Sequence, residues 1–77
     1  MTLYDLATSI TIQSNLEINV YNDKGDHIRS HHFRDLDDFN LYHHDVEYLE
    51  DAEVTYIYCT KSADGEPWLV IDVAICE

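Results

Sequence analysis

The segment from residue 16 to residue 21 alternates strictly between apolar and polar side chains. An alternation of period two is typical of a half-buried β-strand. A turn is predicted at 22–26, where Gly25 can adopt a positive φ, and 27–33 reads as the returning strand. That second strand is polar enough to lie at a sheet edge. These residues therefore predict one β-hairpin.

A second hairpin is predicted from segments 52–60 and 68–76, which are joined by a turn at 61–66. The first of these strands is dense in β-branched and aromatic residues, and the second alternates between apolar and other side chains. The apolar character of both segments leads us to expect that their large aromatic side chains pack in the core and that both cysteines are buried free thiols. A disulfide between neighbouring strands is the alternative. The residues concerned are Tyr56, Tyr58, Trp68, Cys59 and Cys76.

A short helix is predicted over residues 2–9, because Thr2 can cap it and Asp5 follows three positions later. Helical spacing gives it one apolar face, made by Leu3, Leu6, Ala7 and Ile10. Residues 34–51 are acidic and irregular, and they predict a loop with one short helix near 45–50.

The expected fold class is therefore α+β, as a single domain over residues 1–77. We expect a four-stranded antiparallel sheet built from two hairpins, with the N-terminal helix packed on one face. A short helix or loop lies between the hairpins.

Charge is the strongest compositional signal. The chain has 16 Asp and Glu against 4 Lys and Arg, for a net charge of −12. Protonating all five histidines would still leave it negative. Such a field repels nucleic acids and anionic membranes and attracts basic protein surfaces. Plain solubility is the alternative explanation.

The acids concentrate between residues 35 and 53, and no Lys or Arg occurs between residues 35 and 60. Alternate residues of a strand lie about 6.6–6.8 Å apart, which resembles the spacing of successive phosphates. Tyrosines in the same stretch can anchor an interface. The candidate partner-binding residues are Asp35, Asp37, Asp38, Tyr42, Glu47, Tyr48, Glu50, Asp51 and Glu53. A solvated surface loop is the alternative.

Histidines form two adjacent pairs, His31 with His32 and His43 with His44. Neighbouring residues point apart on a strand, and no known zinc pattern matches, so we expect surface histidines and no metal site. No cofactor is expected, because the sequence lacks a phosphate-binding glycine loop. Neither a nucleophile elbow nor a cysteine–histidine pair with an orienting group is present, so we expect a protein that is not an enzyme.

Three short segments carry a resemblance, at 3–7 (LYDLA), 11–14 (TIQS) and 20–23 (VYND). In size, charge and this pattern, the chain resembles small acidic proteins of bacterial mobile elements and phages. That group includes anti-CRISPR and anti-restriction proteins, some of which are DNA mimics. The resemblance implies inhibition of a CRISPR or restriction nuclease and assigns no functional residue.

The favoured function is thus an acidic binding protein that inhibits or sequesters a basic nucleic-acid-binding protein. The alternative is a small interaction module, a homodimer formed through a sheet edge or a tyrosine patch, in which charge serves only solubility. The third hypothesis is a metal- or pH-responsive histidine protein. A cytoplasmic location is expected, because no leader and no apolar run of about 20 residues occurs.

Overall fold

Helix α1 (Leu3–Ser9) opens the computed structural model, which describes residues 1–76. A capping box begins the helix: the Thr2 hydroxyl accepts from the Asp5 amide at 3.1 Å, and the Asp5 carboxylate accepts from the Thr2 amide at 3.1 Å. The apolar face is shorter than predicted. Ile10 is exposed, because the helix ends at Ser9 and the Ile10 backbone is already extended.

The first predicted hairpin is confirmed as β1 (Leu16–Asn22) and β2 (His27–Phe33). The Asn22 side-chain carbonyl accepts from the backbone N–H groups of Lys24 and Asp26, each at 2.9 Å. The turn also places Gly25 at φ +86°, a conformation that suits glycine. Strand β2 lies at a sheet edge, as its polarity predicts.

The second hairpin is β3 (Glu53–Lys61) and β4 (Pro67–Ile75). A bulge interrupts its register between Val54 and Tyr56. A bulge adds one unpaired residue and bends the strand. The bulge therefore interrupts the alternation of β3 side chains between the two faces of the sheet near the start of the strand.

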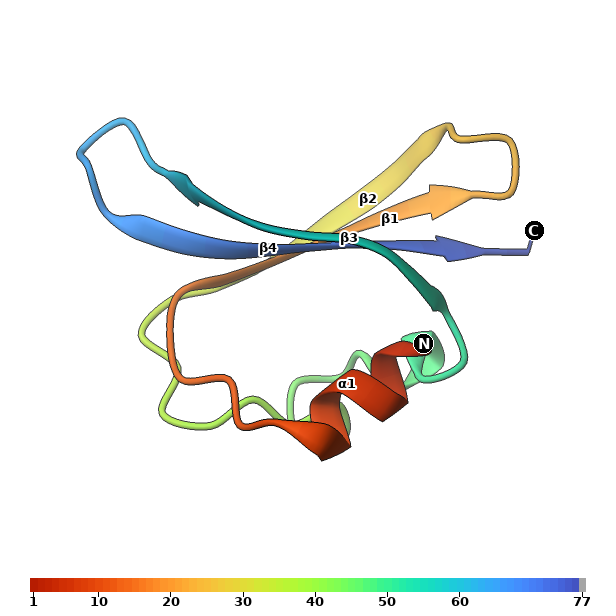
Figure 1. Ribbon diagram of the computed structural model, residues 1–77, viewed down its shortest axis with the longest axis horizontal. Coiled ribbons are helices and arrows are strands. Elements are labelled where there is room, and N and C mark those ends of the chain that lie inside the picture. The colour runs from red at the N-terminus through yellow and green to blue at the C-terminus, as the bar shows by residue number, and fades with distance from the viewer. Residues whose placement is uncertain (77) are drawn as a thin grey trace.

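The sheet is mixed, so the prediction of four antiparallel strands is wrong. Its strand order is β2-β1-β4-β3, and the central pair β1 and β4 is parallel. The connection between the hairpins, residues 34–52, causes this difference. It leaves β2 at one end of the sheet and returns beneath the sheet to the other end before β3 begins (Figure 1). Parallel strands require a long crossover of this kind.

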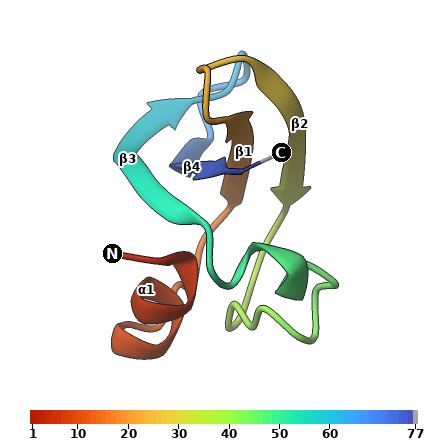
Figure 2. The same ribbon diagram turned by 90° about the vertical axis from the view of Figure 1, so that its right-hand side faces the viewer.

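One face of the sheet is covered. Helix α1 lies under the β3–β4 side and the connection lies under the β1–β2 side, with the 3-10 turn η1 (Glu47–Leu49) in the connection (Figure 2). The short helix predicted near 45–50 is confirmed as this turn. The core between the layers contains Leu3, Leu6, Ile12, Leu16, Ile18, Val20, Phe39, Leu41, Val46, Leu49, Ala52, Ile71 and Val73.

No described element covers the other face, which is called the open face below (Figure 1). Register places Tyr56 and Tyr58 there, opposite Asp72 and Val70, and both tyrosines are exposed. The prediction that these two tyrosines pack in the core is therefore wrong. Trp68 is half-buried.

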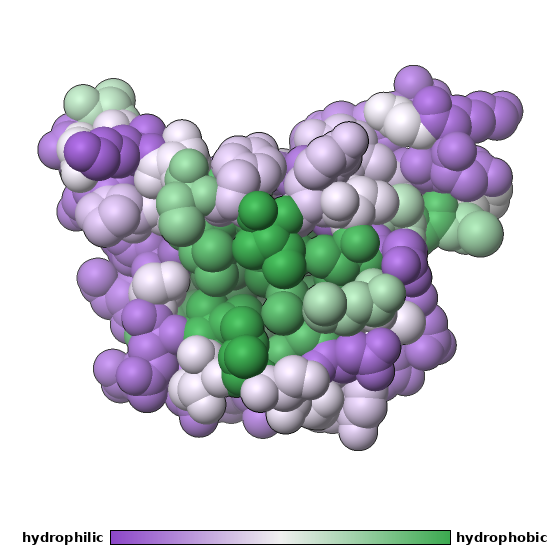
Figure 3. All heavy atoms as spheres, in the orientation of Figure 1, coloured by the Kyte–Doolittle hydropathy of each residue, from purple (hydrophilic) through white to green (hydrophobic). Residues whose placement is uncertain are grey.

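The prediction of buried thiols is also wrong, since Cys59 and Cys76 are both free and exposed. Cys59 lies on edge strand β3, where it pairs with Leu69 and faces the covered side of the sheet. On the side of the molecule drawn in Figure 3, apolar residues are exposed between the sheet and α1. Within the described residues, no helix has the length and apolar character needed to span a membrane.

Candidate functional site

The acidic connection contains eight of the nine residues predicted to bind a partner, and Glu53 begins β3. The structure divides this set. The part with Asp35, Asp37 and Asp38 leaves β2 at the left of Figure 1, and the part around η1 lies at the right, near the N-terminus. All nine are exposed except Glu50, which is half-buried. The connection thus presents two separate acidic regions.

In the region around η1, Tyr42 and Glu50 are brought together. The Tyr42 hydroxyl donates to Glu50 Oε2 at 2.8 Å. This hydrogen bond, with a smaller contribution from desolvation, raises the pKa of Tyr42. The Tyr42 ring remains 54% exposed and can still contact a partner.

Tyr48 turns toward the sheet edge. Its hydroxyl is hydrogen-bonded to Nε2 of His31, and its ring lies 5.8 Å from the Arg29 guanidinium carbon. Arg29 is one of the four Lys and Arg residues of the chain, so one acidic region sits next to a cation. Glu53 is paired with the α-amino group of Met1 at 2.9 Å.

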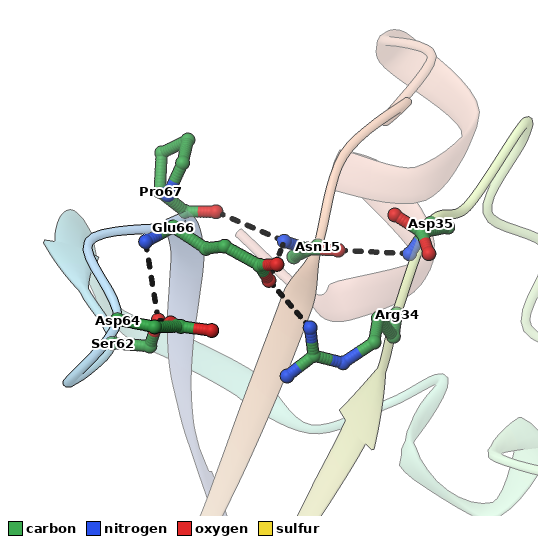
Figure 4. Close-up of polar contacts among 7 residues, drawn as sticks. All are labelled: Asn15, Arg34, Asp35, Ser62, Asp64, Glu66 and Pro67. Carbon is green, nitrogen blue, oxygen red and sulfur yellow. Dashed lines mark hydrogen bonds and ion pairs between the residues drawn. The ribbon is translucent and has the colours of Figure 1, made fainter.

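The other acidic region begins at a polar cluster, which connects the start of β1, the end of β2 and the start of β4 by hydrogen bonds and an ion pair (Figure 4). Asn15 accepts from the Asp35 amide at 2.8 Å and donates to the Pro67 carbonyl at 3.3 Å. Arg34 pairs with Glu66 and also lies 5.4 Å over the Trp68 ring. This cluster holds the start of the connection against the β3–β4 turn. Its Arg34 is the second of the four Lys and Arg residues, after Arg29, that lies beside an acidic region.

The open face carries a polar network that sequence reasoning missed. A row of paired residues crosses the sheet from Ser30 through Asn19 and Asp72 to Tyr56. The Ser30 hydroxyl donates to Asn19 Oδ1 at 2.6 Å, and His27 Nε2 lies 2.8 Å from that hydroxyl. Because the serine proton is already used, His27 must be the donor in this contact.

Asn19 is the centre of this network. Its Nδ2 donates to Asp72 Oδ1 and to Glu17 Oε2, both at 3.0 Å. Glu17 in turn lies 2.8 Å from His32 Nε2. One buried amide therefore holds two carboxylates close together, and only the carboxylate of Glu17 has a basic neighbour. No pattern within one strand predicts this arrangement, because it depends on the register of four strands.

A groove of about 450 Å³ opens beside Asp72. Its lining also includes Asn22, Asp23 and Gly25 of the turn, together with Tyr21, Thr55, Tyr56 and Ala74. It joins the two hairpins at the β1–β2 turn end of the open face. Its lining combines the acidic residues Asp23 and Asp72 with the aromatic residues Tyr21 and Tyr56.

The negative charge is mostly left unneutralised. Among residues 1–76, ion pairs engage only Glu17, Glu53 and Glu66, and one of these uses a histidine. The remaining described acids form no ion pair, although Asp5, Glu50 and Asp64 accept hydrogen bonds from Thr2, Tyr42 and Ser62. A positive partner surface would therefore find carboxylates without an ion-pair partner both in the connection and at the groove.

Among residues 1–76, no group of three or more His, Cys, Asp or Glu side chains is arranged so that it could hold a metal ion. His31 and His32 lie on opposite faces of edge strand β2, as their adjacency predicts. His44 stacks on Phe39 at 5.8 Å between ring centroids. His43 contacts His44 edge-on.

Two features thus stand out as candidate binding surfaces: the divided acidic connection, and the open face with its buried amide and groove. Both combine unpaired carboxylates with exposed tyrosines. Comparison of the chain with protein-family models, with curated proteins and with solved structures finds no match.

Proposed function

We propose that this protein is an acidic binding protein that occupies the basic groove of a protein that binds DNA or RNA. The observation that carries the proposal is the unneutralised charge: −12 overall, with three carboxylates ion-paired among residues 1–76. Charge of one sign accelerates association with a surface of the opposite sign and lets the protein compete with phosphates.

The tyrosines give the proposal its short-range contacts. Tyr42 and Tyr48 are about half exposed beside the acids of the η1 region. Tyrosine favours interfaces because its ring buries area while the hydroxyl stays hydrogen-bonded. In the bound state the acids attract the partner, and the tyrosines stabilise the complex once water has been excluded.

The experiment is a competition assay with a panel of CRISPR and restriction nucleases. Each enzyme is mixed with labelled DNA and increasing amounts of this protein, at several salt concentrations. We expect at least one enzyme to lose DNA binding, with inhibition that weakens as salt rises. Absence of inhibition in every member of the panel would overturn the proposal for these partners.

Two matched variants locate the surface. In one variant, Asp35, Asp37 and Asp38 are each replaced by Asn. In the other, Glu47 and Glu50 are replaced by Gln and Asp51 by Asn. Each removes three charges from one end of the connection. A larger loss of inhibition in one variant identifies the region that contacts the partner. Unchanged inhibition by both variants would contradict the role of the connection.

A second candidate is a homodimer formed through β3, and the exposure of that strand favours it. The outer edge of β3 is covered only at its start, where the Val54 N–H donates to the Met1 carbonyl at 2.8 Å. Beyond Tyr56 no described strand pairs with the outer edge of β3, the edge that faces away from β4. Ile57 on this strand is 46% exposed. A long, apolar, unpaired edge is a template for another strand.

Light scattering separates the two candidates. Two copies of a chain of charge −12 repel, so a β3 dimer should strengthen as salt rises, whereas a complex with a basic partner should weaken. Ile57→Lys should weaken the dimer, because it replaces an apolar contact on the strand edge with a charged side chain that favours water. Gln13→Lys, at an exposed position away from β3, is the matched control. A monomer at every salt concentration would exclude the dimer.

A further inference from the structure

The groove on the open face has a buried carboxylate as its floor. Asp72 is only 9% exposed, and its Oδ1 accepts from Asn19 Nδ2 at 3.0 Å. Among the described residues it forms no ion pair. A carboxylate removed from water is costly to keep without a compensating positive charge. The groove therefore contains a negative charge that a bound cation would offset.

The neighbours of Asp72 reinforce this negative charge. Asn19 cannot give it a second N–H, because its other amide hydrogen goes to Glu17 Oε2. Asp23 also lines the groove. The effect reaches Tyr58, whose pKa is raised by desolvation first and then by the charges of Asp72, Tyr21 and Glu17. An anionic ligand would meet repulsion here, and a neutral one would leave the charge unbalanced.

The walls of the groove suit an organic cation with an apolar stem. Tyr21 and Tyr56 line it, and Tyr56 is 69% exposed although no packing role requires it there. Aromatic faces attract ammonium and guanidinium groups and cover the methylenes that precede them. The volume of about 450 Å³ lies within the range of ligand sites.

We propose that this groove binds an alkyl guanidinium or ammonium group, the end of an arginine or lysine side chain of the partner. The stem lies against Tyr21 and Tyr56, and the head group pairs with Asp72. The inference rests on the proposed function, which supplies a basic partner, and it adds a pocket that recognises one of its side chains.

Nuclear magnetic resonance titration of the whole protein tests the site with small probes. N-acetyl-arginine amide and N-acetyl-lysine amide carry the cation, and N-acetyl-citrulline amide is a neutral control of the same shape as the arginine probe. We expect saturable shifts at the groove residues with dissociation constants on the order of millimolar for the cations. Equal shifts with the citrulline probe would overturn the proposal.

Variants assign the contacts. Asp72→Asn keeps the shape and should weaken cation binding about tenfold or more, because the charged hydrogen bond is lost. Tyr56→Ala, at an exposed position, should weaken it about three- to fivefold. Asp64→Asn removes an equal charge from the β3–β4 turn and should leave binding unchanged. If Asp72→Asn and Asp64→Asn have the same effect, the groove does not hold the cation.

The same variants separate this inference from the proposed function. If a nuclease binds the Asp72→Asn protein as tightly as the wild type, and the probes do not bind, the groove inference fails and the proposed function stands. If the cation probes bind at the groove but no basic partner is inhibited, the groove inference stands and the proposed function fails.

Discussion

Asn19 is buried although no described element covers its face of the sheet, and both its amide N–H groups and its carbonyl form hydrogen bonds. It joins β1 to both neighbouring strands, through Ser30 on β2 and Asp72 on β4. At the scale of single residues, this amide links the two hairpins on the open face. The apolar core makes the corresponding link on the covered face.

Replacing Asn19 with Ala should reduce the free energy of unfolding by about 1–3 kcal/mol, because Asp72 and Ser30 lose buried partners. Urea unfolding followed by circular dichroism measures the change. Gln13→Ala, at an exposed position with no side-chain hydrogen bond among the described residues, should stay within about 0.5 kcal/mol of the wild type. Equal stability of the two variants would show that the network contributes nothing.

His31 introduces a pH dependence at the same scale. Its pKa is lowered, first by burial and then by the charges of Arg29 and His32, and its Nε2 contacts the Tyr48 hydroxyl. The unfolded chain therefore takes up this proton at a higher pH than the folded chain. The stability that a neutral His31 contributes is fully present at pH values above the ordinary pKa of histidine. It is lost as the pH falls from that pKa through the lower pKa of His31 in the folded state.

His31→Gln should accordingly flatten part of the decrease in stability between about pH 7 and pH 5. Thermal unfolding at several pH values, compared between the variant and the wild type, measures this effect. An unchanged slope would mean that His31 does not contribute to the pH dependence.

At the scale of elements, the β1–β2 turn depends on its glycine. Gly25 has φ +86°, and a Cβ built there meets no atom within 4 Å. Gly25→Ala should therefore cost about 1 kcal/mol through backbone strain alone. Gly25→Asn should cost less, because Asn tolerates the left-handed region. Denaturant unfolding compares the two variants, and equal losses would argue against strain as the cause.

The elements themselves were largely predictable, since α1 and both hairpins follow from local patterns and turn residues. How the hairpins join was not. An alternation of period two gives the faces of a strand but not its neighbour or direction, and the direction of β3 is set by the path of residues 34–52. The exposed tyrosines of β3 were missed for a related reason, because only the order of strands reveals an edge.

At the scale of the whole molecule, charge should oppose folding as well as favour binding. Folding brings 16 acids and few cations into a small volume. Added sodium chloride screens this repulsion, so the unfolding temperature should rise between about 0.01 M and 0.5 M salt. The variant with Asp35, Asp37 and Asp38 neutralised should show a smaller rise. A wild-type unfolding temperature that is independent of salt would contradict the argument.

The sequence also defined the acidic connection as a candidate site, because charge density is visible along the chain. It gave no sign of the groove. Asp72 and Asn19 are 53 positions apart, and their contact depends on the parallel pairing of β1 with β4. A site built from register alone is not visible in local composition.

That parallel pairing also affects how the chain acquires its structure during synthesis. Strand β1 is made early, yet one of its two neighbours, β4, is the last described strand to leave the ribosome. Contacts of such long sequence separation form late and slow the folding reaction. Until β4 arrives, β1 has an unpaired edge and its apolar side chains lack part of the core, so the first hairpin alone exposes a surface on which another strand can pair.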